Sequence, residues 1–127
     1  MYGNVEPAFD LCELAHAAGA TYVARGTSWG YQQLVNVIAG GIAHRGFSMV
    51  EAMATCPTYY GRFNLTADPA GFLLSQKEHA VPAAKYDEGE TRSHDRYPVG
   101  LLHHREREEY VNALLGLREQ AQGQGDV

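Results

Sequence analysis

Hydrophobic and polar positions alternate along the first half of the chain in a helix, strand, helix, strand order. The first repeat at helical spacing consists of Ala8, Leu11, Cys12, Ala15 and Ala18. The short β-prone run at residues 21–25 is bounded by glycines and predicts a strand. After an expected N-cap at Ser28, a second helical face is formed by Tyr31, Leu34, Val35, Ile38 and Ile42. Residues 47–54 are apolar almost throughout, which predicts a central strand covered on both faces.

The strand, helix and strand with short links predict a βαβ unit with two parallel strands. Two strands do not complete a doubly wound sheet, and a strand buried on both faces needs neighbours at both edges. We therefore expect the chain to be part of a larger α/β assembly. Gly40 and Gly41, inside the second helix, either permit close packing or weaken its last turns, at about 1 kcal/mol each relative to alanine.

The second half of the chain has a different character. A helix is predicted from Asp68-Pro69 to about His79, and residues 81–96 form a polar stretch that predicts a loop wrapping a partner. Residues 97–102 predict a short extended piece, and residues 105–120 a last helix with Tyr110, Leu114, Leu115 and Leu117 as its apolar side chains. The fold class is α/β, a βαβ unit followed by a mostly helical or irregular C-terminal arm.

Composition narrows the function classes. The 127 residues allow one domain at most, and the net charge of −5 argues against nucleic acid or an anionic membrane as the main partner. No apolar run is long enough to span a bilayer, and the N-terminus lacks the basic and apolar regions of a signal peptide. Two cysteines do not form a disulfide framework or complete a four-thiolate cluster, so we expect a reducing, cytoplasmic compartment.

Cys56 is the candidate for chemistry, at the start of the run Cys-Pro-Thr-Tyr-Tyr-Gly-Arg (residues 56–62). It directly follows the second predicted strand, and α/β sheets bind ligands at the carboxyl ends of their strands. The residue type alone favours a packed core cysteine, because free cysteine is among the most buried residues. Cys12 lies on the apolar side of a predicted helix and is interpreted as core.

Four blocks of the sequence carry a resemblance to a known family; they lie at residues 2–15, 18–27, 46–51 continued by 56–62, and 98–103. Together they resemble the C-terminal part of the beta subunit of 2-oxoacid:ferredoxin oxidoreductases. The resemblance covers nearly the whole chain. It departs from the family at Phe63, where a basic residue is usual. Among substrates, the block at 56–62 looks most like the 2-oxoglutarate-type enzymes, with pyruvate next.

The resemblance implies that Cys56 is the fourth ligand of a [4Fe-4S] cluster. It also implies that the other three ligands, and the motif that binds thiamine diphosphate and magnesium, lie in an N-terminal part of the subunit outside this chain, so that the chain alone is inactive. Residues 1–56 would form the second half of the thiamine-binding domain, and residues 57–127 the C-terminal extension. The implied reaction is oxidative decarboxylation of a 2-oxo acid to an acyl-CoA, with the alpha subunit and ferredoxin as partners.

Other side chains carry weaker signals. Arg62 could contact an anion, although a surface or interface role is favoured. Glu51 lies in an apolar strand and must either pair with a cation or reach a polar rim. The spacing of His94, His103 and His104 fits no compact zinc pattern. The adjacent side chains of His103 and His104 would also point to different sides of a strand or helix. Two alternatives stay open: a non-catalytic assembly subunit, or a standalone α/β domain that binds a small molecule.

Overall fold

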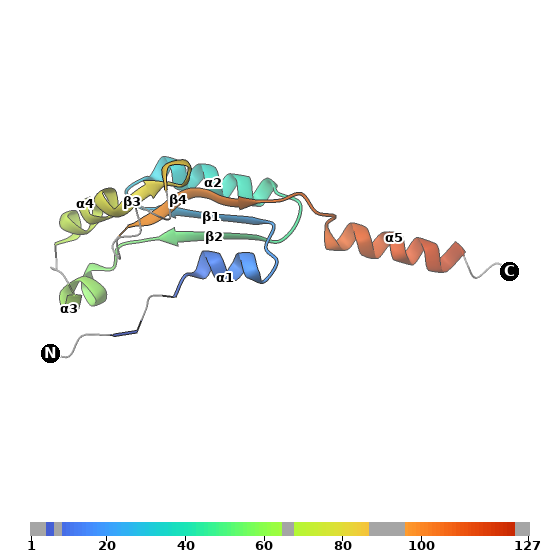
Figure 1. Cartoon of the computed structure of the whole chain (residues 1–127), viewed down its shortest axis with the longest axis horizontal. Helices are drawn as coiled ribbons and strands as arrows, with labels where there is room; N and C mark the ends of the chain where they lie inside the picture. Colours follow the sequence, from blue (N-terminus) through green and yellow to red (C-terminus); the bar gives the residue numbers. More distant parts are fainter. Residues whose placement is uncertain (1–4, 7–8, 65–67, 87–95, 124–127) are drawn as a thin grey trace.

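The computed structural model describes residues 5–6, 9–64, 68–86 and 96–123. Among these residues, four strands form one mixed sheet in the order β2, β1, β4, β3 (Figure 1). The strands are β1 (Tyr22–Thr27), β2 (Ser48–Met53), β3 (Ala80–Pro82) and β4 (Tyr97–His104). The helices are α1 (Leu11–Ala17), α2 (Tyr31–Ala43), α3 (Arg62–Asn64), α4 (Pro69–His79) and α5 (Tyr110–Gly123), with a π-helical turn η1 (Pro57–Gly61) and a 3₁₀ turn η2 (Ala83–Lys85).

The predicted βαβ unit is confirmed. Strands β1 and β2 are parallel, with Tyr22 opposite Ser48 and Thr27 opposite Met53, and α2 connects them. The expectation that residues 47–54 form a central strand covered on both faces is wrong within the described residues. There β2 is an edge strand with mostly half-buried side chains, whereas every residue of β1 is buried.

Helices cover both faces of β1 because its side chains alternate between them. Val23 faces α1 and packs with Cys12 and Ala15. Tyr22 and Ala24 face α2 on the opposite side. The core is thus two small apolar layers separated by one strand, which is the arrangement of a βαβ unit within a larger sheet.

The structure decides between the two roles considered for Gly40 and Gly41 of α2, close packing or weakening of the helix. A Cβ at Gly40 would lie 2.5 Å from the hydroxyl oxygen of Tyr22, and one at Gly41 would lie 3.1 Å from a methyl carbon of Val50. The Tyr22 hydroxyl donates a hydrogen bond of 2.9 Å to the Val37 carbonyl. The glycines therefore permit close packing of α2 on the sheet, and the helix continues past them to Ala43.

The second half contributes more strand than its sequence predicted. Strand β4 runs antiparallel to β1, and β3 pairs with β4 within the stretch expected to be a loop. The Arg105 amide donates to the Thr21 carbonyl at 2.8 Å and continues the sheet pairing past β4, and the last helix begins later than predicted, at Tyr110. The carboxylate of Glu109 then accepts hydrogen bonds from the first amides of α5.

Helix α5 extends away from the sheet (Figure 1). Its apolar side chains are exposed, including Tyr110, Leu114 and Leu117. In the ranges that the structure describes, no helix has the length and apolar character required to cross a bilayer. The division of the chain after residue 56 stays a prediction.

Candidate functional site

The Cys56 thiol lies in the turn that follows β2, at the carboxyl ends of the two parallel strands. It is exposed, so the expectation from residue type alone, a packed core cysteine, is wrong. Gly61 donates its backbone N–H to the Cys56 carbonyl at 3.0 Å and closes the π-helical turn η1. The sharp turn after a short strand leaves this side chain outside the core, where a ligand can reach it.

Backbone N–H groups of η1 act on the Cys56 thiol. Those of Tyr60, Tyr59 and Thr58 hold the pKa of this thiol below its ordinary value of 9.0 and outweigh the opposing effect of desolvation. Backbone N–H groups near a sulfur favour its anionic form. The Cys56 thiol at the end of β2 is therefore deprotonated more readily than that of an ordinary cysteine.

Aromatic side chains surround the turn. The Tyr59 ring contacts Phe63 edge-on with centroids 5.5 Å apart, and Tyr60 contacts Phe72 of α4 at 5.7 Å. The Arg62 guanidinium lies 6.0 Å from the Phe63 ring centre. Arg62 is exposed, in line with the surface or interface role that the sequence favours over an anion contact.

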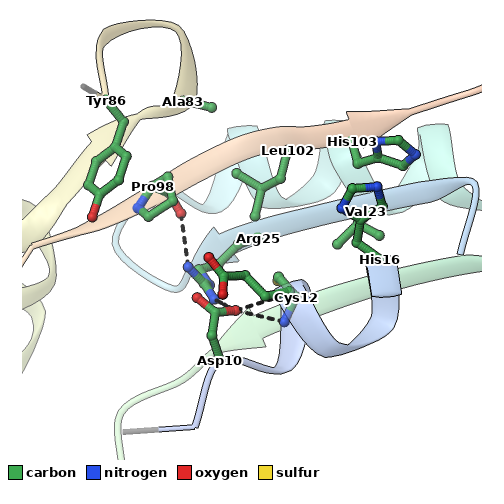
Figure 2. Close-up of a pocket in the computed structure, with 11 residues that line it drawn as sticks. Asp10, Cys12, His16, Val23, Arg25, Ala83, Tyr86, Pro98, Leu102 and His103 are labelled. Atoms are coloured by element: carbon green, nitrogen blue, oxygen red, sulfur yellow. Dashed lines mark hydrogen bonds and ion pairs between the residues drawn. The ribbon is translucent and has the colours of Figure 1, made fainter. Parts of the chain in front are cut away.

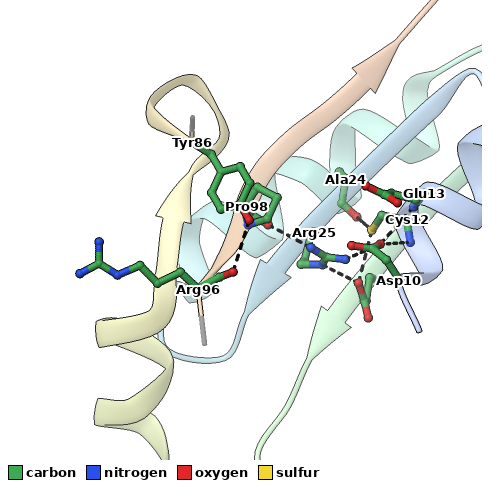
Figure 3. Close-up of polar contacts among 9 residues, drawn as sticks. Asp10, Cys12, Glu13, Ala24, Arg25, Tyr86, Arg96 and Pro98 are labelled. Carbon is green, nitrogen blue, oxygen red and sulfur yellow. Dashed lines mark hydrogen bonds and ion pairs between the residues drawn. The ribbon is translucent and has the colours of Figure 1, made fainter. Parts of the chain in front are cut away.

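A second polar centre lies on the α1 side of the sheet, around Arg25 of β1 (Figure 3). Its buried guanidinium donates to Asp10 at 2.8 Å and to Glu51 at 2.6 Å. Of the two alternatives for Glu51, a cation partner or a polar rim, the structure shows the first, since Arg25 lies in register with it on the neighbouring strand. Asp10 also caps α1, because its carboxylate accepts from the amides of Cys12 and Glu13. Arg25 thus ties the start of α1 to both parallel strands.

Cys12 belongs to the core, as predicted. Its sulfur lies 3.3 Å from a Glu51 carboxylate oxygen and 3.8 Å from the Ala24 carbonyl. Burial is the main reason that the pKa of this thiol rises to about 12; Arg25 opposes the rise and Glu51 adds to it. A thiol that keeps its proton at neutral pH is a poor nucleophile and metal ligand.

A cavity of about 490 Å³ opens beside Arg25, between α1, β1, β4 and η2 (Figure 2). It is lined by Asp10, Cys12, Glu13, His16, Val23, Arg25, Ala83, Tyr86, Pro98, Leu102 and His103. The His16 and His103 rings stack with centroids 3.9 Å apart. Desolvation, followed by the charges of His16, Arg105 and His104, lowers the pKa of His103.

The histidines at the end of β4 point to opposite faces of the sheet, as predicted. His103 contacts His16 of α1, whereas His104 contacts Tyr22 and His44 on the α2 side. Among the residues that the structure describes, no group of three or more His, Cys, Asp or Glu side chains could hold a metal ion. His94 lies outside the described residues.

Sequence reasoning missed two polar residues. The pairing of Arg25 with Asp10 joins positions that no local pattern connects, although a charged residue within a short β-prone run was a signal. The second missed residue is Gln76 of α4, which is buried although it is polar. A polar side chain at a core-facing position indicates hydrogen-bond partners inside the fold.

No protein-family model matches the chain. It is 42% identical over 119 residues to 2-oxoglutarate synthase subunit KorB of Methanocaldococcus jannaschii, covering 93% of this chain and 44% of that protein. The KorB subunit of Methanothermobacter marburgensis is 38% identical over 129 residues, covering 99% of this chain and 45% of that protein. The beta subunit of 2-oxoacid:ferredoxin oxidoreductase 2 from Aeropyrum pernix is 29% identical over 115 residues, covering 81% of this chain and 36% of that protein.

The fold is also found in a solved structure. It is the 2-oxoglutarate:ferredoxin oxidoreductase from Magnetococcus marinus with 2-oxoglutarate, coenzyme A and succinyl-CoA bound. The superposition has a TM-score of 0.72 at 22% identity and covers 99% of this chain and 44% of that one. The chain thus spans less than half the length of the relatives that it matches. Within that span, the similarity shows that the chain belongs to the family of 2-oxoacid:ferredoxin oxidoreductase beta subunits.

Proposed function

We propose that the chain is part of the beta subunit of a ferredoxin-dependent 2-oxoacid oxidoreductase, which converts a 2-oxo acid to an acyl-CoA. The preferred substrate is 2-oxoglutarate, because the most similar of the relatives named above are 2-oxoglutarate synthase subunits. The observation that carries the proposal is the exposed Cys56 thiol in a family member, at the carboxyl end of β2 and with its pKa lowered by the backbone of the turn that follows.

The residues of the turn fit a [4Fe-4S] cluster as one of its ligand sites. Cys56 would supply one thiolate, and the amides that already favour its anionic form would donate to the sulfur. When bound, such a cluster supplies one-electron transfer. Cys12 is buried and protonated and does not fit as a second ligand. We therefore assign the remaining ligands, together with the site for thiamine diphosphate and magnesium, to another part of the subunit.

The chain's own residues would hold this edge of the site in place. Arg25 joins α1 to β1 and β2, whose carboxyl ends lead toward the Cys56 turn. The exposed apolar side chains of α5 suit contact with the alpha subunit or the rest of the beta subunit. Ferredoxin is the proposed electron acceptor. Both cysteines are free thiols, which suits a reducing cytoplasm.

The test compares two cysteine variants in the assembly that purifies with the tagged chain under anaerobic conditions from its own host. We expect wild type and Cys12→Ala to contain iron and acid-labile sulfide and to reduce ferredoxin when given 2-oxoglutarate and coenzyme A. Cys56→Ser should lose the cluster's electron paramagnetic resonance signal and most of the activity. Intact iron content and activity in Cys56→Ser would instead support an assembly role for the chain.

A further inference from the structure

Gln76 of α4 forms a bridge between the carboxyl ends of the two parallel strands. The residue is 8% exposed, and both ends of its side-chain amide make hydrogen bonds. The Oε1 atom accepts hydrogen bonds of 3.0 Å from the Ser28 hydroxyl and of 3.0 Å from the Trp29 backbone N–H, just after β1. The Nε2 atom donates to the Met53 carbonyl, the last residue of β2, at 3.0 Å.

The bridge fixes the two strand exits relative to each other. The Met53 carbonyl also accepts from the Ser28 backbone N–H at 3.0 Å, so the Gln76 amide closes a small ring of hydrogen bonds. A carboxamide both accepts and donates at this site, whereas a carboxylate cannot donate and an aliphatic side chain can do neither. Because Met53 keeps its bond from Ser28 without Gln76, loss of this amide should not leave the carbonyl unpaired.

Helix α4 also touches the turn that carries Cys56. Phe72 lies one helical turn before Gln76 on the same side of the helix, and its ring contacts Tyr60 in η1 at 5.7 Å. The Tyr60 N–H is the first of the backbone groups that lower the pKa of the Cys56 thiol. Helix α4 therefore contacts the chain on both sides of Cys56. It contacts Tyr60 after Cys56 and, through Gln76, the Met53 carbonyl three residues before Cys56.

We propose that Gln76 is a positioning residue for the iron site: it fixes the exit of β2 and the docking of α4, and thereby the orientation of the turn that presents Cys56. This inference rests on the proposed function as far as the cluster is concerned. N–H···S hydrogen bonds favour the more negative, reduced state of an iron–sulfur cluster. A looser turn should therefore move the midpoint potential of the cluster in the negative direction.

The chain offers a matched set of variants. Gln76→Met keeps the length of the side chain and removes all three hydrogen bonds. Ser28→Ala removes one of them from the other side of the bridge and keeps the test open if Gln76→Met does not assemble. Ser75→Ala is the control, because the Ser75 hydroxyl contacts His79 within α4 itself.

The experiment measures two quantities on the purified assembly: amide hydrogen exchange by mass spectrometry and the midpoint potential of the cluster by redox titration. For Gln76→Met we expect exchange about tenfold faster in residues 57–61, unchanged exchange in β1, and a more negative potential. Ser28→Ala should show smaller shifts of the same sign, and Ser75→Ala none. A general loss of stability would instead speed exchange in β1 as well.

The outcomes separate the two proposals. Unchanged exchange in residues 57–61 together with an unchanged potential in Gln76→Met overturns the role of Gln76 and leaves the proposed function standing. Equal acceleration throughout the chain also overturns it, since the residue would then stabilise the fold without positioning the turn. A wild-type assembly without iron overturns the proposed function, and the role of Gln76 at the iron site falls with it.

Discussion

Replacement of Arg25 by methionine should cost more stability than any other change at the Arg25 centre. The guanidinium side chain is 6% exposed and neutralises two carboxylates, so its removal leaves Asp10 and Glu51 without their cation. Breaking a buried ion pair on one side costs about 3–5 kcal/mol. Asp10 is 37% exposed and partly screened by water, whereas Glu51 is 23% exposed, so we expect the lower end of this range, about 3 kcal/mol.

Urea unfolding measures this loss. The chain has one tryptophan, Trp29, next to the sheet exit, and its fluorescence reports the transition. A fall of about 3 kcal/mol is a large part of the roughly 5–15 kcal/mol by which domains are stable. Arg45→Met, at an exposed position after α2, is the matched control and should change stability by less than about 0.5 kcal/mol.

A triple variant tests the physical cause. If unpaired carboxylates are responsible, Arg25→Met combined with Asp10→Asn and Glu51→Gln should regain most of the lost stability, because asparagine still caps α1. The reasoning is refuted if Arg25→Met alone costs less than about 1 kcal/mol, or if the triple variant is as unstable as the single one.

Three further predictions concern the thiols, the glycines and pH. At pH 8 iodoacetamide should modify Cys56 at least about 10³-fold faster than Cys12, whose pKa is about 12, and equal rates read by peptide mass spectrometry would contradict the assigned environments. Gly40→Ala should lower the melting temperature, because its Cβ collides with Tyr22, whereas Gly116→Ala, with open space around it, should raise it slightly. The pKa of His103 lies below 6.5 in the folded chain, so the unfolded chain binds the proton more readily and stability should fall as the pH drops below 6.5. His103→Gln should weaken that fall between pH 7 and 5, as measured by thermal melts. An identical fall in both proteins would refute the assignment.

Local patterns of the sequence predicted the order of the helices and strands of the first half, although the expected N-cap at Ser28 was wrong, because α2 begins after Gly30 and the Ser28 hydroxyl bonds to Gln76. The apolar repeat in α1 and α2 and the β-prone run of β1 depend on neighbours a few residues apart, and such short-range order is readable from spacing. The parallel pairing of β1 with β2 followed from the short links and the helix between them. The family resemblance, carried by blocks along nearly the whole chain, was likewise a property of the sequence.

Tertiary structure alone decided the features that depend on register. Arg25 meets Glu51 because two strands pair with these residues side by side, and it meets Asp10 because α1 folds back over the sheet. Strand β4 joins β1 in antiparallel register, which extends the sheet past the predicted end of the strand. The Gln76 bridge links α4 to residues 23 and 48 positions earlier in the chain. These contacts join residues far apart in sequence, and their geometry is fixed only when the whole sheet is assembled, so no local pattern encodes them.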